Sequence, residues 1–389
     1  MSILKAVKVS RAPFFGLGIV GLYWGTFSAM VPELKAQVGA SDAQLGWALM
    51  TAAIGGMAAM FLAPKVAKAL GKYQLPVLAV LLALLSQLPV FAHSLPFMFV
   101  MMVVLGAGVS GFDITSNMRL SELEERHGLH LMNVNHAMFS LCFGLSALAV
   151  GWMRQSGMGI AEVFPFMGGI LLFVSVLTWE KNWKPMHKEE GDAAAPASLP
   201  WFFILTVAVM LFVSFVGENA TESWSALFIE RELGGAVGHG SFGPTTLGLV
   251  MFTVRLLGQV FTEKLGEERV VLWSGVFGVI GSLVMALAPT QTVALLGIGI
   301  SAIGMAVIVP TANSLLGKLV HREQRAVAIS RAWMFGFSGF FIGPALIGFV
   351  SQHWGLRVAF VIVAGLVATI IPAVLMIKSK RAAGSYSGA

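Results

Sequence analysis

Residues 181–200, "KNWKPMHKEEGDAAAPASLP", interrupt a chain that is otherwise strongly apolar. This stretch is charged at its start and rich in Ala, Pro and Ser at its end, which is typical of a linker. The whole chain has 389 residues, of which 57% are hydrophobic and 11% are charged, and its mean hydropathy is +0.83. Soluble domains carry roughly a quarter charged residues. The composition therefore predicts an integral membrane protein.

Apolar runs of about 20 residues, the length that crosses about 30 Å of hydrocarbon, lie on both sides of this linker. Six precede it and six follow it, at 14–31, 45–63, 75–91, 96–117, 135–152, 163–179, 201–228, 245–262, 270–288, 293–316, 326–350 and 358–377. We therefore expect an all-α membrane protein with twelve transmembrane helices in two pseudo-symmetric six-helix bundles. The bundles are predicted at 1–180 and 201–389, with 181–200 as a cytoplasmic linker.

Basic residues in the loops predict the orientation of the chain in the membrane. Of the 25 Lys and Arg residues, 19 fall on the face that carries the N-terminus and the linker. Four fall on the opposite face, namely Lys35, Arg154, Arg231 and Arg357. This asymmetry predicts a multi-pass protein of the cytoplasmic (inner) membrane with both termini in the cytoplasm. The pI of about 9.5 then reflects topology, and no nucleic-acid partner is expected.

The two halves of the sequence resemble one another. The stretch "SLCFGLSALAVGWM" (140–153) shares its spacing of Gly and aromatic residues with "FGFSGFFIGPALIGFV" (335–350). Aligning Gly144 with Gly339 places His136 over Arg331. A six-plus-six symmetry of this kind is typical of transporters that alternate access around a site between their halves.

Several motifs resemble those of the major facilitator superfamily, and the resemblance covers nearly the whole chain. The loop "APKVAKALGK" (63–72) resembles the superfamily signature, with Ala63, Ala67 and Lys68 in place of its Gly, Asp and Arg. The stretches "DITSNM", "NHAMFSLCFG" and "ESWSALFIERELG" are similar to the fucose-permease-like branch. The resemblance implies the major facilitator fold and a proton-coupling acid at Asp113.

Ionisable residues inside the predicted spans need a partner, a water-filled cavity or a function, because each costs roughly 2.5–3.5 kcal/mol near mid-membrane. Five residues are the main candidates: Asp113, His136, Glu218, Arg255 and Arg331. Asp113 shares a helical face with Asn117 at i+4. We predict that Asp113 and His136 bind the coupled proton. The alternative is a structural role for Asp113, in an ion pair or a helix-to-helix hydrogen bond with a residue such as His136 or Arg331.

The seventh span, "FVGENATESWSALF" (215–228), places Glu218 and Glu222 on one helical face. Glu218 and Arg255 reach similar depths, so a buried ion pair is predicted there, with Arg331 as a third member of this set. Glu222 is the better solute ligand of the two acids.

Aromatic and amide side chains complete the predicted solute site. The predicted solute-binding residues are Tyr23, Trp24, Phe27, Asn117, Asn219, Glu222, Trp224, Asn313 and Trp333. Asn313 follows Pro310 in "VPTAN", which predicts a broken tenth helix, although an Asn that packs between helices explains it equally well. The charged stretch "SELEERHGLH" (121–130) is predicted to be a solvated loop.

The sequence gives little support for a disulfide, a metal site or a nucleotide-binding site. The single cysteine, Cys142, excludes an intramolecular disulfide and a cysteine-based zinc site. Glycine patterns such as "GLGIVG" lie in apolar spans without a following strand, so no nucleotide site is expected. We predict no metal and no cofactor.

The leading interpretation is a secondary transporter that imports a small polar solute, a sugar or organic solute, by proton symport. An exporter of amphiphilic compounds and a solute sensor that does not transport are the alternatives. We do not expect an enzyme, because no nucleophile, base and orienting group converge in the sequence. The expected partners are the solute, protons and the lipid bilayer, and the chain is expected to be a monomer.

Overall fold

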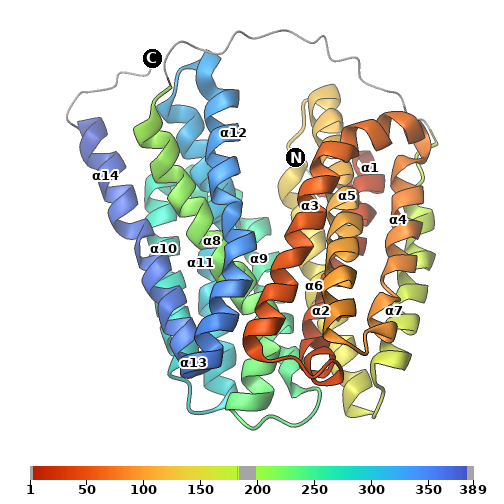
Figure 1. Cartoon of the computed structure of the whole chain (residues 1–389). Helices are drawn as coiled ribbons and strands as arrows, with labels where there is room; N and C mark the ends of the chain where they lie inside the picture. The colour runs from red at the N-terminus through yellow and green to blue at the C-terminus, as the bar shows by residue number, and fades with distance from the viewer. Residues whose placement is uncertain (1–2, 182, 184–198, 383–389) are drawn as a thin grey trace. The chain divides into compact units, whose positions relative to one another are not determined.

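The structure is a computed structural model that describes residues 3–181, 183 and 199–382 (Figure 1). Regular structure in these residues is helical. The α-helices are α1 (Ile3–Val9), α2 (Arg11–Gln37), α3 (Asp42–Leu70), α4 (Gln74–Leu85), α5 (Leu95–His127), α6 (Met132–Gln155), α7 (Ile160–Ser175), α8 (Trp201–Leu227), α9 (Phe242–Leu265), α10 (Glu267–Ala286), α11 (Gln291–Leu319), α12 (Arg325–Gly336), α13 (Ser338–Ala368) and α14 (Ile370–Ala382). Short 3₁₀ or π turns cover Gly71–Tyr73, Leu88–Phe91, Val176–Thr178, Phe228–Glu232, His239–Ser241 and Arg322–Gln324.

The predicted spans coincide with these helices. Within the described part of the chain, nine helical segments are long and apolar enough to cross a membrane. Two of them, Asp42–Phe91 and Arg325–Ala382, each contain two predicted spans. The predicted span 245–262 lies within α9. The prediction of an all-helical membrane fold is confirmed.

The prediction of a solvated loop at 121–130 is wrong for residues 121–127. Residues 121–127 continue α5, which is 33 residues long. Glu and Arg are good helix formers, and Glu122 of this extension forms an i,i+3 ion pair with Arg119 of the preceding turn. The helix ends only at Gly128, whose φ of 62° is the left-handed conformation that glycine adopts without steric cost.

The prediction that the tenth helix is broken is also wrong. Helix α11 runs unbroken from Gln291 to Leu319 with Pro310 inside it. The helix is therefore not broken at Pro310, although proline removes one backbone N–H from the hydrogen-bond ladder. Asn313 is presented by a continuous helix.

The chain forms two compact units. The first contains Met1–His187 and Glu222–Leu256, and the second contains Lys188–Thr221 and Leu257–Ala389. Helices α8 and α9 each contribute residues to both units. Residues 182 and 184–198 of the predicted linker lie outside the described residues. The assignment of 1–180 and 201–389 to two bundles stays a prediction.

Close backbone contacts through glycine pack the helices of the first unit. A Cβ added at Gly106 of α5 would lie 1.9 Å from the Ala52 carbonyl oxygen of α3. A Cβ added at Gly55 of α3 would lie 1.9 Å from the Val103 carbonyl oxygen. Small residues at such crossings are typical of membrane helices, because they let the two backbones approach.

Gly106→Ala should therefore destabilise the protein by about 1–3 kcal/mol, since the added methyl group forces α3 and α5 apart. Thermal unfolding of the purified protein in detergent measures the loss. Gly169→Ala is the matched control, because a Cβ at Gly169 in α7 meets nothing within 4 Å. Equal melting temperatures for the two variants would contradict this account of the crossing.

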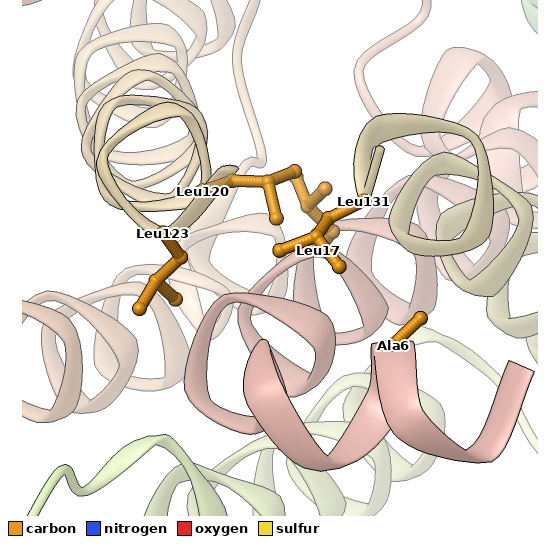
Figure 2. Close-up of a cluster of buried hydrophobic side chains, with 5 residues drawn as sticks. All are labelled: Ala6, Leu17, Leu120, Leu123 and Leu131. Carbon is orange, nitrogen blue, oxygen red and sulfur yellow. The ribbon is translucent and has the colours of Figure 1, made fainter. Parts of the chain in front are cut away.

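A hydrophobic cluster packs the N-terminal helix α1 against other helices of the first unit. Ala6, Leu17, Leu120, Leu123 and Leu131 are buried together, and the side chains of Leu17, Leu120 and Leu131 meet at its centre (Figure 2). These residues come from α1, α2, α5 and the start of α6. The cluster therefore fixes α1 against the end of α5 that carries the charged extension.

Close backbone contacts through glycine also pack the helices of the second unit. A Cβ at Gly281 of α10 would lie 2.2 Å from the Ser301 backbone nitrogen of α11. A Cβ at Gly339 of α13 would lie 2.3 Å from the Phe212 carbonyl oxygen of α8. These approaches pack α10 against α11, and α13 against the part of α8 that belongs to the second unit.

Candidate functional site

Helix α5 places the Asp113 carboxyl group within a predicted span, where it is half-buried. The Asn117 amide nitrogen donates to the Asp113 backbone oxygen at 3.0 Å and also interacts with the Asp113 carboxylate. Among the described side chains, no basic group forms a salt bridge with this carboxylate. An acid without an ionic partner at this depth is a group that can carry a proton through a transport cycle.

A polar cluster lies on α6 and α9 of the same unit. The Arg255 guanidinium donates from Nη1 to the Ser140 hydroxyl at 2.5 Å. The Ser140 hydroxyl in turn donates to the His136 backbone oxygen at 3.1 Å. Arg255 lies close enough to the His136 ring for a Coulombic interaction. The structure therefore brings together two of the predicted site residues and adds Ser140, which the sequence analysis did not identify.

Three predicted solute-binding residues form an aromatic cluster on α2. The ring centroids of Tyr23 and Trp24 are 5.3 Å apart, and those of Trp24 and Phe27 are 5.7 Å apart, both in edge-to-face geometry. Tyr23 is 1% exposed, and its hydroxyl has no hydrogen-bond partner among the described residues. A buried hydroxyl without a partner costs free energy, so this group is available to a polar ligand or water.

The part of α8 in the first unit carries two further predicted residues. Trp224 is fully buried, and its indole nitrogen has no hydrogen-bond partner among the described residues. Glu222 is half-buried, two positions before it.

The second unit holds the remaining polar residues of the predicted site. Asn219 and Asn313 each have a buried side-chain oxygen without a hydrogen-bond partner among the described residues. Glu218 is half-buried on α8. The predicted pairing of Glu218 with Arg255 stays a prediction.

An aromatic cluster of the second unit contains Trp333. Its ring centroid lies 5.6 Å from that of Phe215, and Phe215 also contacts Phe337 and Phe340. Arg331, two residues before Trp333 on α12, is exposed. Its place in a buried ion pair stays a prediction.

The second unit also has a charged pocket of about 420 Å³. Its lining includes Glu267, Glu268, Lys318 and Arg381. Glu267 pairs with Lys318, and Arg381 pairs with Glu268 at 2.6 Å. These four charged residues are thus paired with one another, and none of the predicted site residues lines the pocket.

No group of three or more His, Cys, Asp or Glu side chains among the described residues is placed to hold a metal ion.

Two ion pairs at one end of the first unit were not predicted from the sequence. Arg154 pairs with Glu230 at 2.6 Å, and Arg231 pairs with Asp42 at 2.7 Å. Arg154 and Arg231 are predicted to lie on the sparsely basic membrane face, and their sequence positions do not indicate their partners. The scarcity of basic residues on that face could have indicated these pairs. Where so few basic residues occur, each one is expected to have a specific partner.

Comparison with known proteins identifies the family of this chain. The family model of the Major Facilitator Superfamily matches residues 13–302 and 207–386. An uncharacterized MFS-type transporter of Yersinia pestis is 27% identical over 368 residues, which are 93% of each chain. The crystal structure of a D-xylose–proton symporter is similar with a TM-score of 0.70, at 16% identity and with 97% of each chain covered. A bacterial homologue of the human lysosomal transporter Spinster also has a TM-score of 0.70, at 15% identity and with 100% of each chain covered. This chain belongs to the major facilitator superfamily.

Proposed function

We propose that this protein is a secondary transporter that imports a small polar solute together with protons by alternating access. Membership of the superfamily supports transport of a small molecule across a membrane. The polar and ionisable side chains inside the spans support a polar solute, because lipid-facing positions do not tolerate them.

The observation that carries the proposal is the Asp113 carboxyl group. It lies within a span, it is half-buried, and among the described side chains it has the Asn117 amide beside it and no basic partner. A carboxylate in this position is disfavoured when charged and tolerated when protonated. Its protonation therefore couples to a conformational change that alters its exposure to water.

The other polar groups have separate roles in this proposal. Tyr23, Trp224, Asn219 and Asn313 supply hydrogen-bonding atoms that lack partners among the described residues. Trp24 and Phe27 supply aromatic faces, which suit the apolar faces of a sugar ring. These roles accord with a place in the fucose-permease-like branch, and the named substrate of the related symporter, D-xylose, is also a sugar.

The proposal is tested by flux into proteoliposomes. Purified protein is first screened by thermal shift against a panel of monosaccharides, polyols and nucleosides. A solute that raises the melting temperature is then supplied in radiolabelled form. We expect saturable uptake with the protein and none in protein-free vesicles. A solute that binds but never crosses would instead identify a sensor.

We also propose that the chain is a monomer of the inner membrane with both termini and the linker in the cytoplasm. A cysteine placed at Ala193 in a Cys142→Ala background should then react with an impermeant maleimide only after the cells are permeabilised. The physical reason is the 19-to-4 distribution of basic residues between the two faces. Labelling of intact cells would contradict this orientation.

A further inference from the structure

The charged pocket of the second unit lies where four helices end or begin. Helix α9 ends at Leu265, α10 begins at Glu267, α11 ends at Leu319 and α14 ends at Ala382. All four of these ends contribute residues to the lining of the pocket, whose volume is about 420 Å³. None of the residues predicted to bind solute or protons is among them, so the pocket needs an explanation of its own.

Part of the lining is apolar. Leu315 and Leu319 lie one turn apart on α11 and are 2% and 6% exposed. Leu265, the last residue of α9, also lines the pocket and is 46% exposed. An inorganic ion gains nothing from such a surface, whereas the glycerol backbone and first acyl carbons of a lipid are stabilised by contact with it. The apolar part of the lining therefore favours an amphiphilic ligand.

The rest of the lining carries more positive than negative charge. It includes three cations, Arg269, Lys318 and Arg381, and two carboxylates, Glu267 and Glu268. Arg269 is exposed and forms no ion pair among the described side chains. The lining therefore has an excess of one positive charge, which favours an anionic ligand.

The two carboxylates hold two of the cations in place without using all of their donors. Glu267 pairs with Lys318 and also accepts the Ser314 hydroxyl at 3.1 Å, and Arg381 donates from Nη1 to Glu268 at 2.6 Å. A guanidinium has five N–H donors and an ammonium has three, so both cations keep donors for a further acceptor. The Lys318 and Arg381 side chains are 65% and 55% exposed, so a ligand can reach them. Cations that are already held bind an oxyanion with less loss of side-chain entropy.

The pocket lies at the depth of the lipid headgroups. Leu265, Lys318 and Arg381 follow shortly after the ends of the eighth, tenth and twelfth predicted spans. At a rise of about 1.5 Å per residue, these positions are about 3–6 Å outside the hydrocarbon. The headgroup layer is about 5–7 Å thick on each side of a bilayer. The phosphate groups of lipids are therefore present at the level of the pocket.

We propose that this pocket binds the headgroup of an anionic phospholipid. Arg269, Lys318 and Arg381 donate to oxygens of its phosphate group, and its glycerol backbone lies against Leu315 and Leu319. The bound lipid ties the ends of α9, α10, α11 and α14 to one another. The 19-to-4 asymmetry of basic residues predicts that the pocket lies in the cytoplasmic leaflet, where anionic lipids attract basic groups. The binding itself does not depend on the proposed transport function.

Native mass spectrometry of the purified protein in detergent tests this proposal, because it counts the lipid molecules that stay bound and measures their affinity. The protein is titrated with phosphatidylglycerol, which is anionic, and with phosphatidylcholine, which carries a phosphate but no net charge. We expect one tight site that prefers phosphatidylglycerol by about fivefold, the factor expected for one basic group at a membrane surface. Equal affinity for the two lipids would overturn the anionic headgroup.

Arg269→Gln should weaken the binding of phosphatidylglycerol about fivefold. This variant strands no acid among the described side chains, so it should melt at the wild-type temperature in lipid-free detergent. Lys378→Gln is the matched control, because Lys378 is an exposed cation at the same end of α14 as Arg381 but does not line the pocket. Equal weakening by both variants would show general attraction to the basic surface and would overturn the site.

Leu265→Gln distinguishes a lipid from free phosphate. It replaces an exposed apolar side chain of the lining by a polar one of similar size, so phosphatidylglycerol should bind about threefold more weakly. Inorganic phosphate should not raise the melting temperature of the wild-type protein more than chloride does at equal ionic strength. A rise with phosphate that Arg269→Gln abolishes, with no lipid retained at the site, would assign the pocket to free phosphate and overturn the lipid.

Discussion

Replacement of Asp113 by Asn is expected to abolish accumulation of solute against its gradient while exchange of solute across the membrane continues. A gradient of about one pH unit stores about 1.4 kcal/mol per proton, so it sustains about tenfold accumulation with one proton per solute. Asn resembles the protonated acid in shape and charge but cannot release a proton. The variant should therefore reach an internal concentration equal to the external one and no higher.

Two further measurements distinguish coupling from a structural role for Asp113. Counterflow exchange and the solute-induced thermal shift should stay close to wild type in Asp113→Asn, and Asp113→Glu should keep part of the accumulation. A structural Asp113 predicts that Asn lowers stability and solute binding together. Undiminished accumulation in the Asn variant, with unchanged pH dependence, would show that Asp113 does not carry the coupled proton.

Arg119→Met is expected to give the largest loss of stability, about 3 kcal/mol. Arg119 is 2% exposed and contacts Glu180 through Nε at 3.0 Å and Nη2 at 2.5 Å. Its Nη1 pairs with Glu122 at 2.7 Å, and its guanidinium lies 5.8 Å from the centre of the Trp183 ring. Removing the cation leaves two carboxylates close together without their counter-charge, which costs about 3–5 kcal/mol in a buried site and less here, because both acids have some access to water.

Thermal or denaturant unfolding in detergent measures this loss. Arg119→Lys should recover only part of it, since an ammonium group cannot make the two-pronged contact of a guanidinium. Lys68→Met, at an exposed residue of α3, removes a cation of the same face and should change stability little. Equal stability of Arg119→Met and Lys68→Met would show that the cluster contributes nothing.

The number and order of the helices could be predicted because membrane spans are selected by length and hydropathy, which are local properties. The ends of the helices were less predictable. Helix α5 continues through the charged stretch 121–127 because its polar residues are also good helix formers. Gly355 interrupts α13 with a φ of 84°, and this break separates the last two predicted spans as expected.

The candidate site could be predicted only as a set of residue types. An ionisable residue in an apolar run is visible in the sequence, so Asp113, His136 and Arg255 were identified. Their neighbours were not, because contacts such as Arg255 with Ser140 join residues 115 positions apart and depend on how α6 meets α9. The pairing of Arg154 with Glu230 across 76 positions escaped prediction for the same reason.

The most direct test of the central claim measures protons and solute in the same vesicles. Proteoliposomes containing the protein are loaded with a pH-sensitive dye, and a solute chosen by the thermal-shift screen is added outside. The account predicts that the lumen becomes acidic as the solute enters through the wild-type protein, and that Asp113→Asn vesicles exchange solute with no change of pH. Solute entry through the wild-type protein without any movement of protons would contradict it.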